Sequence, residues 1–125
     1  MMLDTAAKIL IADDTLAMLV SLRRALVQLG YTNIIEAENG EEALYLLRAN
    51  SDTALVISDW NMEPMDGLEL LRALRADARF KSLPFILASA DAAAVRKLAM
   101  LSGAMQVIQK PFSTETLQRA LAEAA

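Results

Sequence analysis

Five short apolar runs, each followed by a stripe of apolar residues at helical spacing, constrain the fold of this 125-residue chain most strongly. The runs lie at residues 8–12, 34–37, 55–58, 84–88 and 105–109. The first run is continuous rather than alternating, which is typical of a strand that is covered on both faces, and the second predicts a weaker strand. Strands that alternate with helices in this way predict a parallel sheet with right-handed crossovers. A closed barrel would need eight such units, so five predict an open, doubly wound α/β sheet with helices on both faces.

Turn and capping residues predict where the helices begin and end. We expect helices after Asp13–Thr15, which could cap the first one, from Asn39–Gly40, from Gly67, over 91–102 and after Ser113, with a loop over 59–66. In the fourth helix, Val95, Leu98 and Ala99 are spaced to form the inner face, which leaves Met100 directed away from it. The fifth strand holds two glutamines, which suit an edge of the sheet.

The length and composition allow one domain with a substantial core. Hydrophobic residues make up 55% of the chain, and 125 residues are typical of a single domain. The apolar content is too high and the net charge too modest for a disordered chain. We therefore expect one domain over 1–125, with its core from about 8 to 124 and no room for an output domain.

The composition also excludes several kinds of chemistry. The chain has neither cysteine nor histidine, which excludes disulfides, zinc clusters and cysteine nucleophiles and removes the commonest general base. A metal site must then be built from oxygen ligands, which favour hard cations such as Mg²⁺. The formal charge of −4 argues against direct nucleic-acid binding. With no membrane-spanning run and no secretory signal, we expect no membrane insertion and a cytoplasmic protein.

Charged and hydroxyl side chains stand at the carboxyl ends of four predicted strands, which is where open α/β sheets bind ligands. They are Asp13 and Asp14 after the first strand, Asp59 after the third, Ser89 after the fourth and Lys110 after the fifth. Taken alone, each has an ordinary explanation as a cap, a turn residue or a solvated lysine. Helix capping, however, does not require acids, a hydroxyl and a cation at the same edge of the sheet.

Electrostatics makes this grouping more specific. Two carboxylates ~5 Å apart at an effective dielectric constant of ~20 repel by roughly 3 kcal/mol. Such a cluster destabilises the fold unless its pKa values shift or a cation binds. Lys110 supplies a positive charge that could also reach a phosphoryl oxygen.

This set of residues, together with Lys110-Pro111-Phe112 and the five βα units, resembles the receiver domain of two-component response regulators. The segment from Asp59 to Gly67 is similar to that of CheY-like single-domain chemotaxis regulators, and the resemblance runs from about Lys8 to the last helix. It implies a flavodoxin-like fold and a signalling domain that accepts a phosphoryl group from a histidine kinase or a histidine phosphotransfer protein. It also implies that the chain is no enzyme beyond catalysing its own phosphorylation and dephosphorylation.

The resemblance assigns a role to each matching residue. Asp59 is the expected phosphoacceptor, and Lys110 and the Ser89 hydroxyl are expected to hold phosphoryl oxygens. The Lys110–Pro111 peptide bond is expected to be cis. For Mg²⁺ or Mn²⁺ the implied ligands are Asp14, Asp59 and the backbone carbonyl of Asn61, with Asp13 acting mainly through water.

Further expectations concern dephosphorylation and the partner surface. Asn61 and Asp91, two positions after the phosphoacceptor and after the hydroxyl, should orient the attacking water and give a moderately short phosphoryl lifetime. Members of the family often carry an aromatic residue where this chain has Val107, and Thr where it has Ser89. We expect Met100, Gln106 and an exposed Val107 to contribute to a protein-binding face formed by the fourth helix, fifth strand and fifth helix.

Other functions remain open at this stage. The chain could be a phosphorylation-independent receiver that acts as an interaction module, although no acidic residue or lysine of the motif is lost. It could also be a receiver excised from a larger regulator with an output domain. A flavodoxin-like electron carrier fits less well because Asp13 and Asp14 would repel a cofactor phosphate. A haloacid-dehalogenase-like phosphatase usually has Asp-x-Asp, whereas these two aspartates are adjacent.

Overall fold

The computed structural model describes residues 3–124, and within them five strands alternate with five helices. The order along the chain is β1 (Ile9–Ala12), α1 (Leu16–Gln28), β2 (Ile34–Ala37), α2 (Gly40–Ala49), β3 (Leu55–Asp59), α3 (Gly67–Arg75), β4 (Phe85–Ser89), α4 (Ala92–Leu101), β5 (Gln106–Gln109) and α5 (Thr114–Ala122). No helix in this part of the chain has the length and apolar character needed to cross a bilayer.

The strands form one parallel sheet in the order β2-β1-β3-β4-β5. This is the flavodoxin-like order, with a switch in winding direction between β1 and β3. The prediction of a doubly wound parallel sheet is confirmed. β5 lies at one edge of the sheet, as its two glutamines indicated.

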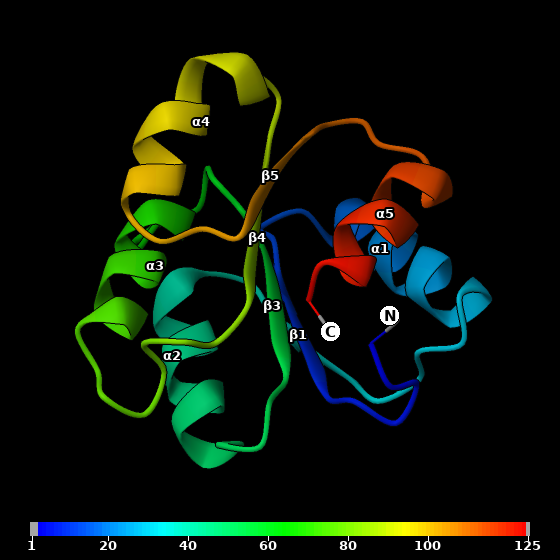
Figure 1. Cartoon of the computed structure of the whole chain (residues 1–125), viewed down its shortest axis with the longest axis horizontal. Coiled ribbons are helices and arrows are strands. Elements are labelled where there is room, and N and C mark those ends of the chain that lie inside the picture. The colour runs from blue at the N-terminus through cyan, green and yellow to red at the C-terminus, as the bar shows by residue number, and fades with distance from the viewer. Residues whose placement is uncertain (1–2, 125) are drawn as a thin grey trace.

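The helices cover the sheet in two layers (Figure 1). α1 and α5 pack together on one face, and α2, α3 and α4 cover the other. Alternate residues of each strand enter the two cores: Ile9 and Ile11 face α1 and α5, whereas Leu10 and Ala12 face the opposite layer. All four are fully or almost fully buried, which explains why the strand is continuously apolar.

Four helices begin at residues whose side chains accept a hydrogen bond from the first turn, namely Asn39, Asp66, Asp91 and Ser113. The prediction of a side-chain cap for α1 is wrong. Thr15 is the N-cap residue but its side chain caps no backbone N–H. The Asp13 carboxylate instead accepts a hydrogen bond of 3.0 Å from the backbone N–H of Thr15, within the turn that leaves β1.

The predicted inner face of α4 is partly wrong. Ala92 and Ala99 are buried and Val95 is half-buried, but Leu98 is 43% exposed. The buried stripe therefore follows spacings of three and four residues through the two alanines, whose small side chains fit against the sheet. Met100 is 44% exposed, in agreement with the prediction that it points away.

A partly buried arginine connects the ends of α3 and α4. The Arg75 guanidinium donates to the backbone carbonyls of Phe80, Leu83 and Gly103 over 2.7 to 3.1 Å. Gly103 has a φ of 105°, and a Cβ there would approach Arg75 to 2.8 Å. The turn after α4 thus requires glycine both for its backbone conformation and for the space next to Arg75.

Candidate functional site

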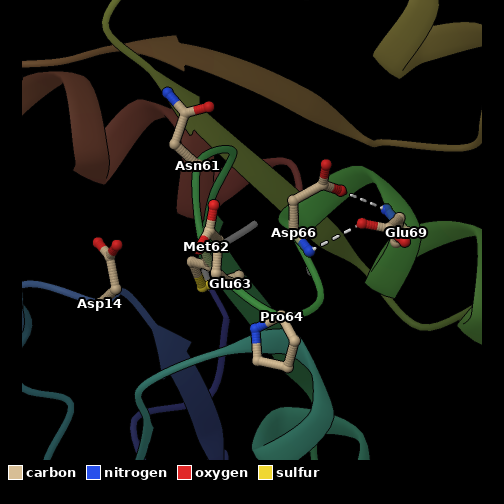
Figure 2. A pocket seen from close by; sticks show the side chains of 7 residues that line it. All are labelled: Asp14, Asn61, Met62, Glu63, Pro64, Asp66 and Glu69. Carbon is tan, nitrogen blue, oxygen red and sulfur yellow. Dashed lines mark hydrogen bonds between the residues drawn. The ribbon is translucent and has the colours of Figure 1, made fainter.

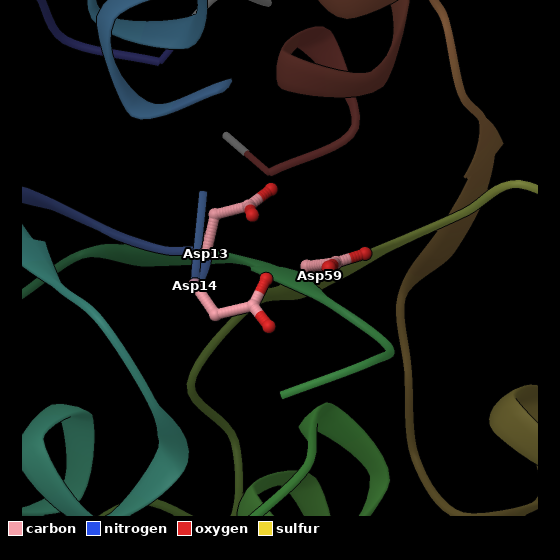
Figure 3. Close-up of side chains that lie close together, drawn as sticks. All are labelled: Asp13, Asp14 and Asp59. Atoms are coloured by element: carbon pink, nitrogen blue, oxygen red, sulfur yellow. The ribbon is translucent and has the colours of Figure 1, made fainter. Parts of the chain in front are cut away.

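Three carboxylates meet at the carboxyl ends of β1 and β3 (Figure 3). The two strands are neighbours with Ala12 opposite Ser58, so the register brings Asp13 level with Asp59. One oxygen from each of Asp13, Asp14 and Asp59 lies within 4.8 Å of the others. Asp13 and Asp59 are buried and Asp14 is exposed. The site is therefore closed on the side of the sheet and open on the side of Asp14.

Lys110 reaches this cluster from the end of β5. Its ammonium nitrogen lies 3.0 Å from Asp13 Oδ2 and 3.1 Å from Asp59 Oδ1. The lysine side chain is 17% exposed, so water screens these ion pairs less than surface pairs. The Lys110–Pro111 peptide bond is cis, as the resemblance implied. The structure thus brings together the acids and the cation that the sequence placed at the strand ends.

Burial and the contacts between Lys110 and the carboxylates shift the pKa values of the site in opposite directions. Burial raises the pKa of Asp59, repulsion from Asp13 raises it further, and the Lys110 hydrogen bond offsets part of the effect. Burial by itself would lower the pKa of Lys110, but hydrogen bonds to Asp13 and Asp59 outweigh it and raise that pKa. One ammonium thus compensates the carboxylate cluster only in part.

The carboxylate cluster has the chemistry of a site for a hard cation. Its three acidic groups offer oxygen ligands only, and they are close enough to share one ion. A bound divalent cation would also relieve the repulsion that raises the pKa of Asp59. Asp13, Asp14 and Asp59 can therefore bind a metal ion.

A pocket of about 490 Å³ extends from Asp14 along the loop after β3 (Figure 2). It is lined by Asp14, Asn61, Met62, Glu63, Pro64, Asp66 and Glu69. Asn61 is exposed and lines the same pocket as Asp14, one member of the carboxylate cluster. The acidic residues further along the loop were not singled out from the sequence, because a carboxylate in a loop is most often simply solvated.

Ser89 ends β4 and is 5% exposed. Its hydroxyl oxygen accepts a hydrogen bond of 3.1 Å from the backbone N–H of Asp91. The Asp91 carboxylate in turn accepts a bond of 3.2 Å from the backbone N–H of Ala94, which makes it the N-cap of α4. Asp91 therefore has a structural role in addition to the predicted effect on dephosphorylation, which stays a prediction.

The predicted partner surface needs one correction. Val107 is 2% exposed and belongs to the core between the sheet and the α2, α3 and α4 layer, so the expected exposed valine is wrong. The physical reason is that α4 packs against β5, so Val107 is buried on the covered face of this edge strand. Gln106 is half-buried, with hydrogen bonds linking it to Arg96 of α4 and to Glu123, the C-cap residue of α5. Met100 and Gln106 remain accessible on this face.

Gln109, the residue before Lys110, was recognised only as an edge residue. Its side-chain amide donates to the backbone carbonyls of Ala90 and Lys110 and accepts from the backbone N–H of Ala92. It thereby joins the end of β5 to the loop that follows Ser89. Its position next to the lysine was the only signal in the sequence.

Comparison with known proteins agrees with this arrangement. The family model of the response regulator receiver domain matches residues 9–122. The chain is 38% identical over 115 residues to the chemotaxis protein CheY1 of Helicobacter pylori, covering 91% of this chain and 93% of that protein. It is 35% identical to a CheY homolog of Campylobacter jejuni, covering 91% of this chain and 88% of that one.

Solved structures give the same result. The chemotaxis protein CheY4 of Vibrio cholerae superposes with a TM-score of 0.87 at 29% identity, covering 96% of this chain and 99% of that one. A CheX–CheY–BeF3–Mg²⁺ complex from Borrelia burgdorferi contains a chain that matches with a TM-score of 0.83 at 26% identity, covering 91% of this chain and 85% of that one.

Proposed function

This chain belongs to the response regulator receiver domain family, and we propose that it is a CheY-like receiver switched by phosphorylation of Asp59. The observation that carries the proposal is the contact of 3.1 Å between Lys110 Nζ and Asp59 Oδ1 inside a cluster of three carboxylates. A nucleophilic carboxylate, a cation and a set of metal-binding oxygens are what phosphoryl transfer to an aspartate needs.

In the proposed reaction, an Asp59 carboxylate oxygen attacks the phosphorus of the donor. A new O–P bond forms, and the donor atom leaves with the electron pair of its own bond to phosphorus. Lys110 already contacts the attacking residue, so its ammonium is positioned to offset negative charge on the phosphoryl oxygens. The hydroxyl of Ser89 is the second candidate donor to those oxygens.

Mg²⁺ or Mn²⁺ would supply positive charge that screens the carboxylates from the incoming phosphoryl group. Asp13, Asp14 and Asp59 are the residues that would hold the ion, with the backbone carbonyl of Asn61 as an additional ligand. The all-oxygen donor set supports this assignment. The CheX–CheY complex of Borrelia burgdorferi includes Mg²⁺, which supports the assignment at the level of the family.

We expect the chain to signal by protein contact and to catalyse nothing beyond its own phosphorylation and dephosphorylation. The phosphoryl donor would be a histidine kinase or a histidine phosphotransfer protein. For the downstream target we favour the face of α4, β5 and α5, where Met100 is 44% and Leu101 77% exposed. The CheX–CheY complex supports protein partners in general. Direct nucleic-acid binding is not expected, and a cytoplasmic location stays a prediction.

The proposal is tested with acetyl phosphate as a small phosphoryl donor. The wild-type protein should gain one phosphoryl group by intact mass spectrometry with Mg²⁺ and almost none with excess chelator. Asp59→Asn should gain none, because an amide is not a competent nucleophile. Asp66→Asn is the matched control, since it removes a carboxylate from the same loop yet leaves a residue that caps helices well. Equal labelling of wild type and Asp59→Asn would refute the assignment.

A further inference from the structure

Gln109 is exposed, yet both ends of its side-chain amide bond to backbone groups of its own molecule. The oxygen accepts a bond of 2.9 Å from the backbone N–H of Ala92. The nitrogen donates to the carbonyl of Ala90, and to the carbonyl of Lys110 over 3.0 Å. An exposed glutamine can bond to water without ordering its side chain, so three backbone bonds mark a fixed position.

The bond to Ala92 satisfies a specific need of α4. Ala92 is the first residue of that helix, and the N–H groups of a first turn have no partner within the helix. The N-cap residue Asp91 bonds to the N–H of Ala94 and leaves that of Ala92 unpaired. Gln109 supplies the missing acceptor from a neighbouring strand, so α4 begins at a point set by β5.

The bonds of Gln109 also hold both ends of the short loop that follows Ser89. Ser89 is joined to β5 by the hydrogen bond of 2.8 Å from the Lys110 N–H to its carbonyl. Its hydroxyl is joined to Asp91. Gln109 holds Ala90 and Ala92, the residues on either side of Asp91. The chain from Ser89 to the first turn of α4 is thus held against the end of β5, which Lys110 directly follows.

From this arrangement we infer that Gln109 is a positioning residue for the phosphorylated state. It holds the Ser89 hydroxyl and the Lys110 ammonium in a fixed relation, so that both can meet one phosphoryl group without the loop having to be ordered first. The inference rests on the proposed function, because it takes Ser89 and Lys110 as the groups that contact phosphoryl oxygens. Prior ordering of a binding loop raises affinity by lowering the entropy cost of binding.

Gln106 provides a matched control within the same strand. It lies at the other end of β5 and bonds to the side chains of Arg96 and Glu123 and to the N–H of Val107. None of these groups belongs to the loop after Ser89. A Gln106→Leu variant therefore loses side-chain hydrogen bonds between β5 and helices α4 and α5, while the bonds of Gln109 are left in place.

The test compares wild type, Gln109→Leu and Gln106→Leu by titration with beryllium fluoride in the presence of Mg²⁺. Binding is followed by the fluorescence of Trp60, the only tryptophan of the chain, which is adjacent to Asp59. Gln109→Leu should bind about fivefold more weakly than wild type, the scale expected for lost hydrogen bonds. Gln106→Leu should bind as wild type does.

Amide hydrogen exchange gives a second readout that general destabilisation would not reproduce. In Gln109→Leu the Ala92 N–H should lose protection, while amides in the middle of β3 keep theirs. Unchanged or tighter beryllium fluoride binding by Gln109→Leu, or continued protection of Ala92, would overturn the inference. A wild-type protein that fails to bind beryllium fluoride would instead overturn the proposed function, and this inference with it.

Discussion

Asp59 is a carboxylate that the fold places where its charge is unfavourable. It is 8% exposed, and both burial and the charge of Asp13 raise its pKa. Lys110 counteracts this only in part. Burial and repulsion between carboxylates make such a site unfavourable for folding, and a bound cation or a changed charge on Asp59 would reduce this cost. That makes the residue a suitable point for a switch.

The raised pKa of Asp59 predicts how stability depends on pH. Below the unfolded-state pKa of about 3.9, Asp59 is protonated in both the folded and the unfolded state, so the penalty is absent. As the pH rises through the higher folded-state pKa, the wild type loses stability relative to a variant that cannot ionise. Without divalent metal, the free energy of unfolding of Asp59→Asn should therefore increase relative to that of the wild type as the pH rises from acidic to neutral.

Urea unfolding at several pH values measures this difference. The Asp66→Asn variant serves as control, because Asp66 is half-buried and lies outside the carboxylate cluster. The difference in free energy of unfolding between Asp59→Asn and wild type should grow toward neutral pH. If it stays constant or shrinks, the pKa of Asp59 is not raised by burial and by Asp13 as we infer.

Asn61 should influence how long the phosphoryl group survives. It lines the pocket beside Asp14, where water could approach a phosphorylated Asp59. Replacing Asn61 by arginine should lengthen the half-life of the phosphorylated protein several-fold, because a bulky cation hinders and misdirects the attacking water. The decay is measured by intact mass after the donor is removed. Glu63→Arg is the control for added charge in the same pocket, and equal effects of the two substitutions would remove Asn61 from the mechanism.

At the scale of elements, the start of α3 shows how local sequence fixes the loop beside the site. The Asp66 carboxylate accepts a bond of 2.8 Å from the N–H of Glu69, and the Glu69 carboxylate accepts one of 3.2 Å from the N–H of Asp66. This reciprocal capping box ends the loop that follows Asp59. Asp66→Ala should lower the free energy of unfolding by about 1 kcal/mol, whereas Asp66→Asn should cost much less. Chemical denaturation distinguishes the two, and equal stabilities would contradict the role of the cap.

Strand positions were predictable because every strand contains a short apolar run. The three inner strands β1, β3 and β4 are buried along their whole length, as parallel strands covered on both faces are. The acid and lysine positions followed, since they stand at strand ends. The orientation of α4 was not predictable from the sequence. Leu98 and Ala99 both lie at a helical spacing from Val95, and only the packing against the sheet determines that Ala99 is buried while Leu98 is exposed. Val107 was placed wrongly because an edge strand still buries one face.

Long-range hydrogen bonds could not be predicted from the sequence either. Arg75 binds carbonyls of three separate residues, and its position in α3 has no local signature. The side-chain amide of Gln109 forms hydrogen bonds with Ala90 and Ala92, which lie 19 and 17 residues earlier in the chain. Such contacts depend on how the crossovers place distant loops, which composition and periodicity do not encode.

At the scale of the whole molecule, the parallel strands β1, β3, β4 and β5 are neighbours, so their carboxyl ends lie at the same end of the sheet (Figure 1). We expect a change of charge there to act on several elements at once. Binding of Mg²⁺ should raise the melting temperature, because a ligand that binds only the folded state stabilises it. Asp59→Asn should weaken this effect most, followed by Asp14→Asn, and Asp66→Asn should keep it. Thermal unfolding with and without millimolar Mg²⁺ tests this, and a wild-type protein indifferent to Mg²⁺ would refute the metal site.

The central claim is that Asp59 itself receives the phosphoryl group. An aspartyl phosphate is an acyl phosphate, which borohydride reduces to homoserine and thereby marks the residue permanently. After treatment with acetyl phosphate, Mg²⁺ and borohydride, tandem mass spectrometry of the peptides should locate homoserine at position 59 and leave Asp13 and Asp14 unchanged. Homoserine at either of those positions, or at none, would contradict the account.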